Sequence, residues 1–122
     1  MAKKILFVED DPALQNALKE AISKEGYDII QAFDGQEGLD RAKENKPDLI
    51  LLDLILPKKD GFAVLESLKA DDGTKDIPVV VLTNLEGIGD VDRALSMGAT
   101  TYLVKVQYEL NEIVEKVKEI LG

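Results

Sequence analysis

The sequence predicts an α/β fold with a doubly wound, five-stranded parallel sheet and five helices, in the order (βα)5. Two observations predict it: short apolar runs alternate with segments of helical spacing, and turn or helix-ending residues separate the two kinds of segment. Such alternation implies right-handed crossovers and helices on both faces of the sheet. At 122 residues the chain has the length of one domain, so we expect a single unit over residues 1–122.

Five apolar runs are the candidate strands, and their composition indicates burial on both faces of a sheet. They are residues 5–8, 29–32, 49–52, 79–82 and 102–104, of which 29–32 is the weakest. Two of the candidate helices have clear apolar stripes. These stripes are Leu14, Leu18, Ala21 and Ile22 near the start, and Leu110, Ile113, Val114, Val117 and Leu121 at the end.

Three shorter helices are expected at residues 35–45, 61–70 and 90–97. Glycine is typical just beyond a helix end, which is the place that Gly26 and Gly98 would take. Segments 45–48 and 76–78 each contain proline and interrupt the chain just before a strand. The charge-rich outer face of the last helix reads as a solvated surface.

Composition excludes several classes of chemistry. The chain has no cysteine and no histidine, so disulfides, thiolate metal sites and imidazole bases are ruled out. Its net charge of −9 would repel nucleic-acid phosphates and anionic membranes, which favours proteins as partners and argues against direct nucleic-acid binding. No apolar run is long enough to span a membrane, and the N-terminal residues do not read as a signal peptide. We therefore expect a cytoplasmic location.

Polar residues follow the predicted strands at one edge of the sheet. In open α/β sheets the functional crevice lies beyond the carboxyl ends of the strands, where the strand order reverses. For the flavodoxin-like order 2-1-3-4-5 this point lies between the first and third strands. The residues that follow the strands there, and after the fourth and fifth strands, are Glu9, Asp10, Asp11, Asp53, Thr83 and Lys105.

Carboxylates crowded at one edge repel each other unless a cation neutralises them or some hold protons. Mg²⁺ suits this place, because it prefers oxygen ligands and is commonly held by one or two carboxylates together with a phosphoryl oxygen. Asp10 and Asp53 fit that role, and Asp53 can also attack phosphorus to give an acyl phosphate. The Lys105 ammonium and the Thr83 hydroxyl can then contact other phosphoryl oxygens.

The same residues resemble the successive motifs of response-regulator receiver domains, in particular single-domain regulators of the chemotaxis type. The motifs are Val8-Glu9-Asp10-Asp11, Leu51-Leu52-Asp53-Leu54-Ile55-Leu56-Pro57 with Asp60-Gly61, Leu82-Thr83, and Gly98-Ala99-Thr100-Thr101-Tyr102-Leu103-Val104-Lys105. The resemblance covers residues 3–121. Each motif alone is weak, but all four occur in order at the ends of the expected strands.

The resemblance implies that Asp53 receives a phosphoryl group. It implies that Asp10, Asp53 and the carbonyl of Ile55 ligate Mg²⁺, with Glu9 acting through water on the metal. It also implies that Thr83 and Lys105 contact the phosphoryl oxygens and that the rotamer of Tyr102 follows the movement of Thr83.

As partners, the resemblance implies a sensor histidine kinase or phosphotransfer protein as donor, and a downstream effector. The effector would bind the face formed by the 90–97 helix, the 102–104 strand and the last helix. Segment 84–90, with Gly87 and Gly89, is the expected moving loop. The chain would be a monomer or weak homodimer that assists its own phosphorylation and dephosphorylation and is not an enzyme in the usual sense. Because no DNA-binding region follows Gly122, output would pass through a separate protein unless the chain belongs to a longer one.

Two positions depart from the family. Receiver domains usually follow the lysine with proline, often through a cis bond, whereas Val106 follows Lys105 here. A cis bond before a residue other than proline costs about 2.5–4 kcal/mol, so we expect a trans bond and a rearranged loop. The residue after Thr83 is usually small, and Asn84 is larger and polar.

Other functions compete with this interpretation. The acids at 9–11 followed by Pro12 could simply cap a helix. A flavodoxin would need a loop after the first strand that attracts phosphate, and this loop is acidic. A phosphatase with an aspartyl nucleophile needs a second acid two residues on, where Ile55 stands. A degenerate receiver that binds partners without phosphorylation is the third alternative, and the intact set of acids, hydroxyl and amine argues against it.

Overall fold

A computed structural model describes residues 2–54, 56, 60–83, 88–104 and 110–121, with the backbone alone at 83, 88–91 and 104. Its five strands all run parallel in the order β2-β1-β3-β4-β5, which confirms the predicted sheet. The strands are β1 (Lys4–Val8), β2 (Asp28–Ala32), β3 (Leu49–Asp53), β4 (Val79–Thr83) and β5 (Thr101–Val104). The helices are α1 (Pro12–Ser23), α2 (Gly35–Asn45), α3 (Gly61–Ala70), α4 (Ile88–Ser96) and α5 (Leu110–Leu121).

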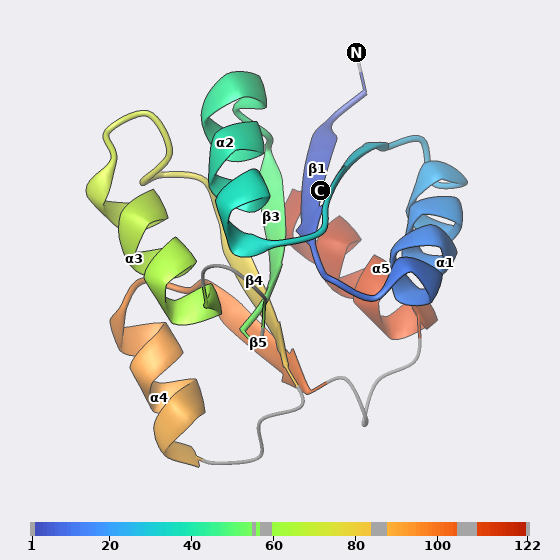
Figure 1. Cartoon of the computed structure of the whole chain (residues 1–122). Helices are drawn as coiled ribbons and strands as arrows, with labels where there is room; N and C mark the ends of the chain where they lie inside the picture. The colour runs from blue at the N-terminus through green and yellow to red at the C-terminus, as the bar shows by residue number, and fades with distance from the viewer. Residues whose placement is uncertain (1, 55, 57–59, 84–87, 105–109, 122) are drawn as a thin grey trace.

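The helices cover the sheet in two layers. Figure 1 shows α1 and α5 on one face and α2, α3 and α4 on the other. Alternate residues of each central strand therefore enter different cores: Leu6 packs with α2 and α3, while Phe7 packs with α1 and α5. The apolar stripes predicted for the first and last helices both face the second of these cores.

Only the three central strands are buried on both faces. All residues of β3 are buried, as are residues 5–8 of β1 and the four β4 residues whose side chains are described. The expectation of full burial is wrong for the two edge strands, because most of β2 is partly exposed and Tyr102 in β5 is 39% exposed. Each edge strand has a neighbour on one side only, so the helices cover it less completely.

The expected helix ends are largely confirmed. Gly26 and Gly98 have φ values of 90° and 106°, a region that favours glycine. The turn before β3 contains one surprise, because Lys46 at the C-cap of α2 takes a left-handed φ of 45° without being glycine. The interruption lies within the predicted segment 45–48, but nothing in the sequence indicates a left-handed residue there.

The fourth helix begins earlier than the sequence predicted. It starts at Ile88 rather than at residue 90, so Gly89 lies in its first turn and not in a loop. Glycine weakens a helix mainly in its interior, and a place next to the start costs less. The remainder of the expected moving loop, residues 84–87, lies outside the described residues. No described helix is long and apolar enough to cross a membrane.

Candidate functional site

The first half of the site comes from the register of two neighbouring strands. In the parallel pair β1 and β3, Val8 and Leu52 are Cα partners. The next residue on each chain is acidic, Glu9 after β1 and Asp53 at the end of β3. Both carboxylates therefore emerge at the same edge of the sheet, at the strand-order reversal between β1 and β3, as the sequence predicted.

Three carboxylates meet at this edge. Glu9, Asp10 and Asp53 each offer an oxygen, and these oxygens all lie within 4.8 Å of one another. Glu9 and Asp53 are almost fully buried, with 1% and 4% of their surface exposed, whereas Asp10 is exposed. The group thus has two enclosed carboxylates and one that faces solvent.

Asp11 belongs to the helix rather than to this group. Its carboxylate accepts a 2.9 Å hydrogen bond from the backbone N–H of Ala13, which makes it the N-cap of α1, with Pro12 as the first helical residue. Its own backbone N–H donates to Glu9 Oε2 at 3.2 Å. The capping interpretation therefore holds for Asp11, and Asp11 also helps to orient Glu9.

Leu54, the residue after Asp53, lies against the start of α3. The N–H of Gly61 donates to the Leu54 carbonyl at 2.9 Å, and a Cβ on Gly61 would overlap the backbone of Leu54 and of Asp53. Asp60 caps α3 by accepting from the N–H groups of Phe62 and Ala63. The Asp60-Gly61 motif therefore starts α3 and allows its first residue to lie close to the backbone of Leu54 and Asp53.

Gln15 in α1 supports the same edge, and the sequence interpretation missed it. Its amide nitrogen donates to the carbonyl oxygens of Phe7, Glu9 and Ala32 at 2.9, 3.1 and 2.7 Å, and the side chain is fully buried. A sequence clue did exist. Gln15 lies three and seven residues before Leu18 and Ile22, so a polar residue stands in line with the buried face of the helix.

Only some of the remaining predicted site residues belong to the described part of the chain. Thr83 ends β4, and its Cα partner is Val104, the residue before Lys105 in the sequence. The side chain of Thr83 lies outside the described residues, as do Ile55, Lys105 and the two departures at Asn84 and Val106, including the expected trans bond. Tyr102 lies in β5 opposite Val81 and exposes 39% of its surface.

The carboxylate group fits a hard divalent cation. Within the described parts of the chain, Glu9, Asp10 and Asp53 are the one set of three acidic side chains close enough to share an ion. Carboxylate oxygens are the ligands that Mg²⁺ prefers, and the exposure of Asp10 leaves room for the waters that Mg²⁺ retains. A cation there would also offset the repulsion among the three charges.

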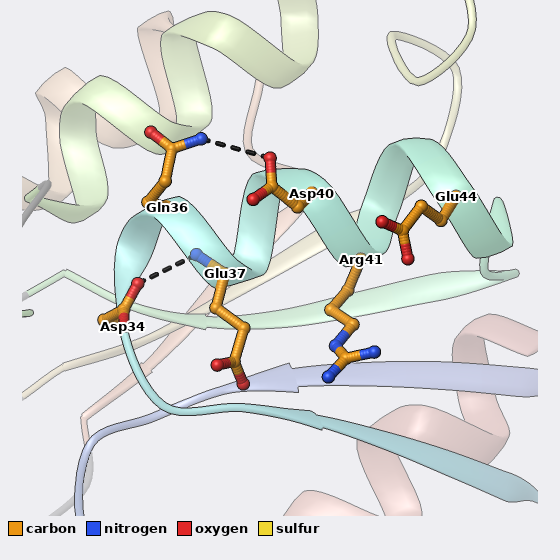
Figure 2. A pocket seen from close by; sticks show the side chains of 6 residues that line it. All are labelled: Asp34, Gln36, Glu37, Asp40, Arg41 and Glu44. Carbon is orange, nitrogen blue, oxygen red and sulfur yellow. Dashed lines mark hydrogen bonds between the residues drawn. The ribbon is translucent and has the colours of Figure 1, made fainter.

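A hollow runs along α2, away from the carboxylate group, and carries no comparable chemistry. Its lining consists of Asp34, Gln36, Glu37, Asp40, Arg41 and Glu44. Figure 2 shows that the hydrogen bonds there belong to the helix itself: Asp34 accepts from the Glu37 N–H at 2.8 Å, and Gln36 donates to Asp40. Glu37 in turn accepts from the N–H of Phe33, the residue before the N-cap, so its carboxylate also serves the start of the helix.

Comparisons with known proteins agree with this geometry. The family model of the response regulator receiver domain matches residues 5–118. The DNA-binding dual master transcriptional regulator RpaA of Synechocystis is 42% identical over 118 residues, which cover 97% of this chain and 48% of that protein. The chain thus spans about half the length of this relative.

Two further relatives match over nearly their whole length. The polar-differentiation response regulator DivK of Brucella anthropi is 35% identical over 122 residues, covering 100% of this chain and 98% of DivK. The receiver domain of a Pseudomonas aeruginosa sensor histidine kinase, solved with a magnesium ion coordinated in its active site cleft, superposes with a TM-score of 0.87. It is 27% identical and the match covers 98% of this chain and 97% of that one.

Proposed function

The chain belongs to the response-regulator receiver domain family, and from that premise we propose that Asp53 is its phosphoryl acceptor. The donor would be a phosphohistidine on a sensor histidine kinase or phosphotransfer protein. Phosphorylation would favour a second conformation of the domain, which a downstream protein recognises. In this proposal residues 1–122 form one receiver domain acting in the cytoplasm, as a monomer or weak homodimer.

The observation that carries the proposal is the placing of Asp53 within the carboxylate group. Its oxygen lies within 4.8 Å of oxygens of Glu9 and Asp10, so a cation bound by these acids would lie next to the nucleophile. Asp53 also ends the fully buried strand β3, whose backbone is fixed by β1 and β4 on either side. The backbone that carries the nucleophile is therefore already in place before the donor arrives.

The proposed transfer conserves atoms and charge without a further reactant. A carboxylate oxygen of Asp53 forms a bond to phosphorus while the bond from phosphorus to the imidazole nitrogen of the donor breaks. The electron pair of that bond remains on the imidazole. Little covalent chemistry is required of the protein, so positioning and charge cancellation account for the catalysis.

Asp10 and Asp53 would hold Mg²⁺ directly together with the carbonyl of Ile55, and Glu9 would act through water. The ion would supply positive charge to offset that of the carboxylates and the phosphoryl group. The donor set supports this assignment, because all its side-chain ligands are oxygens and Asp10 is open to solvent.

Thr83 and Lys105 would make the remaining contacts to the oxygens of the phosphoryl group. The register of β4 and β5 supports this role, since Thr83 lies opposite Val104 and Lys105 is the next residue. A hydroxyl and an ammonium at these positions would each contact one phosphoryl oxygen, and the charge-assisted bond to Lys105 would be the stronger of the two.

Tyr102 and the surface around it are the proposed output of the domain. Tyr102 in β5 and Leu95 in α4 each expose 39% of their surface. Among the described residues, Phe33, at 38%, is the one other large apolar side chain that is exposed to this extent. An effector protein that binds the face of α4, β5 and α5 would cover Tyr102 and Leu95. The domain would thus be a signalling module that assists its own phosphorylation and dephosphorylation, with no other substrate.

The test is phosphorylation by a small-molecule donor with Mg²⁺, followed by intact-protein and peptide mass spectrometry. The wild-type domain is expected to gain one phosphoryl group on Asp53, and Asp53→Asn is expected to gain none while remaining folded. Asp60→Asn is the matched control, because asparagine caps a helix as well as aspartate does. Labelling that persists in Asp53→Asn would show that another residue is the acceptor, and absence of labelling in the wild type would favour the degenerate receiver.

A further inference from the structure

The side chain of Gln15 is a buried polar group that the proposed chemistry does not use. It is fully buried within α1, beneath the loop that carries Glu9 and Asp10. Its amide nitrogen has three carbonyl oxygens within hydrogen-bonding distance, 2.7–3.1 Å away. This crowd of acceptors defines the orientation of the amide, because its oxygen could not face them.

The three carbonyls belong to the point where the chain leaves the sheet. Phe7 is the penultimate residue of β1, Glu9 is the first residue after it, and Ala32 is the last residue of β2. The N–H of Glu9 also donates to the Ala32 carbonyl, at 3.0 Å. Both backbone groups of Glu9 are therefore held, its N–H by Ala32 and its carbonyl by Gln15.

The other end of the amide indicates what this residue does. Among the described residues, Gln15 Oε1 has no hydrogen-bond partner. A buried acceptor without a partner is unfavourable, and an apolar side chain of the same length would avoid that cost. The donating end of the amide is therefore the part that this position uses, and the group that it holds next to the site is the backbone of Glu9.

We propose that Gln15 is a positioning residue for the divalent cation at the carboxylate group, an inference that rests on the proposed function. Gln15 would touch neither the cation nor the phosphoryl group. By fixing the carbonyl of Glu9, it sets the direction in which the chain continues to Asp10, and so keeps both carboxylates within 4.8 Å of that of Asp53. Because the fold already orders these ligands, less of the free energy of Mg²⁺ binding is lost in ordering them.

The test is the Mg²⁺ dissociation constant of Gln15→Met, measured by calorimetric titration of the whole domain. Methionine has a similar length and no donor, so the carbonyls lose their partner while the volume is kept. The dissociation constant is expected to rise about tenfold, the range found when a residue that supports a metal ligand is removed. At saturating Mg²⁺ the rate of phosphorylation should return close to that of the wild type.

Two matched variants separate positioning from a general loss of stability. Leu68→Ala opens a cavity in the core beneath α2 and α3, on the face of the sheet opposite α1. It should lower stability without changing the Mg²⁺ affinity. Gln36→Met makes the same chemical change at an exposed site and should change neither. An Mg²⁺ affinity of Gln15→Met equal to that of the wild type would overturn the positioning role alone.

The remaining outcomes are also decisive. If the wild-type domain binds no Mg²⁺, the metal part of the proposed function and this inference are both wrong. If Gln15→Met does not fold, the wild-type protein gives the answer by NMR. The side-chain amide signals of Gln15 should then shift during an Mg²⁺ titration with the same midpoint as the calorimetric curve, and signals that stay unchanged would overturn the inference.

Discussion

Val8 and Leu52 are Cα partners in the parallel ladder of β1 and β3, and this one pairing brings Glu9 and Asp53 together. A shift of one residue in that register would turn one of the two carboxylates to the opposite face of the sheet. The buried apolar side chains of both strands oppose such a shift, because each side of the sheet has its own core. The packing of the fold therefore determines the distance between the acids.

Mg²⁺ is expected to raise the thermal stability of the domain. A ligand that binds only the folded state stabilises it by about 2.7 kcal/mol when its concentration is 100 times its dissociation constant. Thermal unfolding followed by circular dichroism at increasing MgCl₂ tests this. Sodium chloride at matched ionic strength is the control for screening, and an equal rise in both salts would contradict specific binding.

Asp10→Asn is expected to have opposite effects on the stability of the domain in the absence and in the presence of Mg²⁺. Without Mg²⁺ the variant should be as stable as the wild type or up to about 1 kcal/mol more stable, because one of three neighbouring charges is gone. With Mg²⁺ it should gain much less stability, because a ligand is lost. Asp11→Asn removes the same charge from the adjacent residue but keeps the helix cap, so its response to Mg²⁺ should resemble that of the wild type.

Gly61→Ala is expected to destabilise the domain by about 3 kcal/mol or more, because the new methyl group would overlap backbone atoms of Leu54 and Asp53 that cannot move independently. The Mg²⁺ affinity should fall with it. Gly73→Ala is the comparison: its methyl group meets the Lys46 ammonium at 2.7 Å, and this flexible side chain can move away at a cost below about 1 kcal/mol. Urea unfolding of both variants tests the difference, and equal losses would contradict this account.

Lys105→Ala is expected to retain Mg²⁺ binding but to weaken the response to phosphorylation. A change in population from 1:99 to 99:1 requires about 5.5 kcal/mol, and a hydrogen bond to a charged group contributes about 1.5–3 kcal/mol of it. The ring signals of Tyr102, observed by NMR with beryllofluoride and Mg²⁺, report the change. They should shift fully in the wild type and in the surface variant Lys75→Ala. A full shift in Lys105→Ala would show that the amine is not needed for coupling.

The sheet and the acidic edge could be predicted because both follow from short-range patterns. Each central strand is a run of apolar residues, and the strand order with its reversal point then determines which ends lie together. Glu9 and Asp53 were found in this way, although 44 positions separate them in the sequence. The extent of burial was predicted less well. The order 2-1-3-4-5 already places residues 29–32 and 102–104 at the edges of the sheet, but their apolar composition alone suggested burial on both faces.

The features that sequence reasoning missed depend on exact local geometry. The left-handed φ of Lys46 is a single-residue conformation that residue propensities do not encode, and the start of α4 at Ile88 differs from the prediction by two residues, within the usual uncertainty of a helix end. Gln15 looked like an ordinary polar residue in a helix, because its three acceptors come from two different strands and a loop. Only the folded arrangement brings these together.

The central position of β3 has a consequence for the rate at which different parts of the domain open to solvent. Its amides lie between two neighbouring strands, with a hydrophobic core on each face of the sheet. They should therefore exchange hydrogen for deuterium only when the whole domain unfolds. The outer pair of α4 and β5, with Leu95 and Tyr102 at its surface, should admit deuterium through smaller, more frequent openings. Asp53 therefore lies at the end of the strand that is expected to open most rarely. The proposed output surface on α4 and β5 lies where a small free energy is enough to change the conformation.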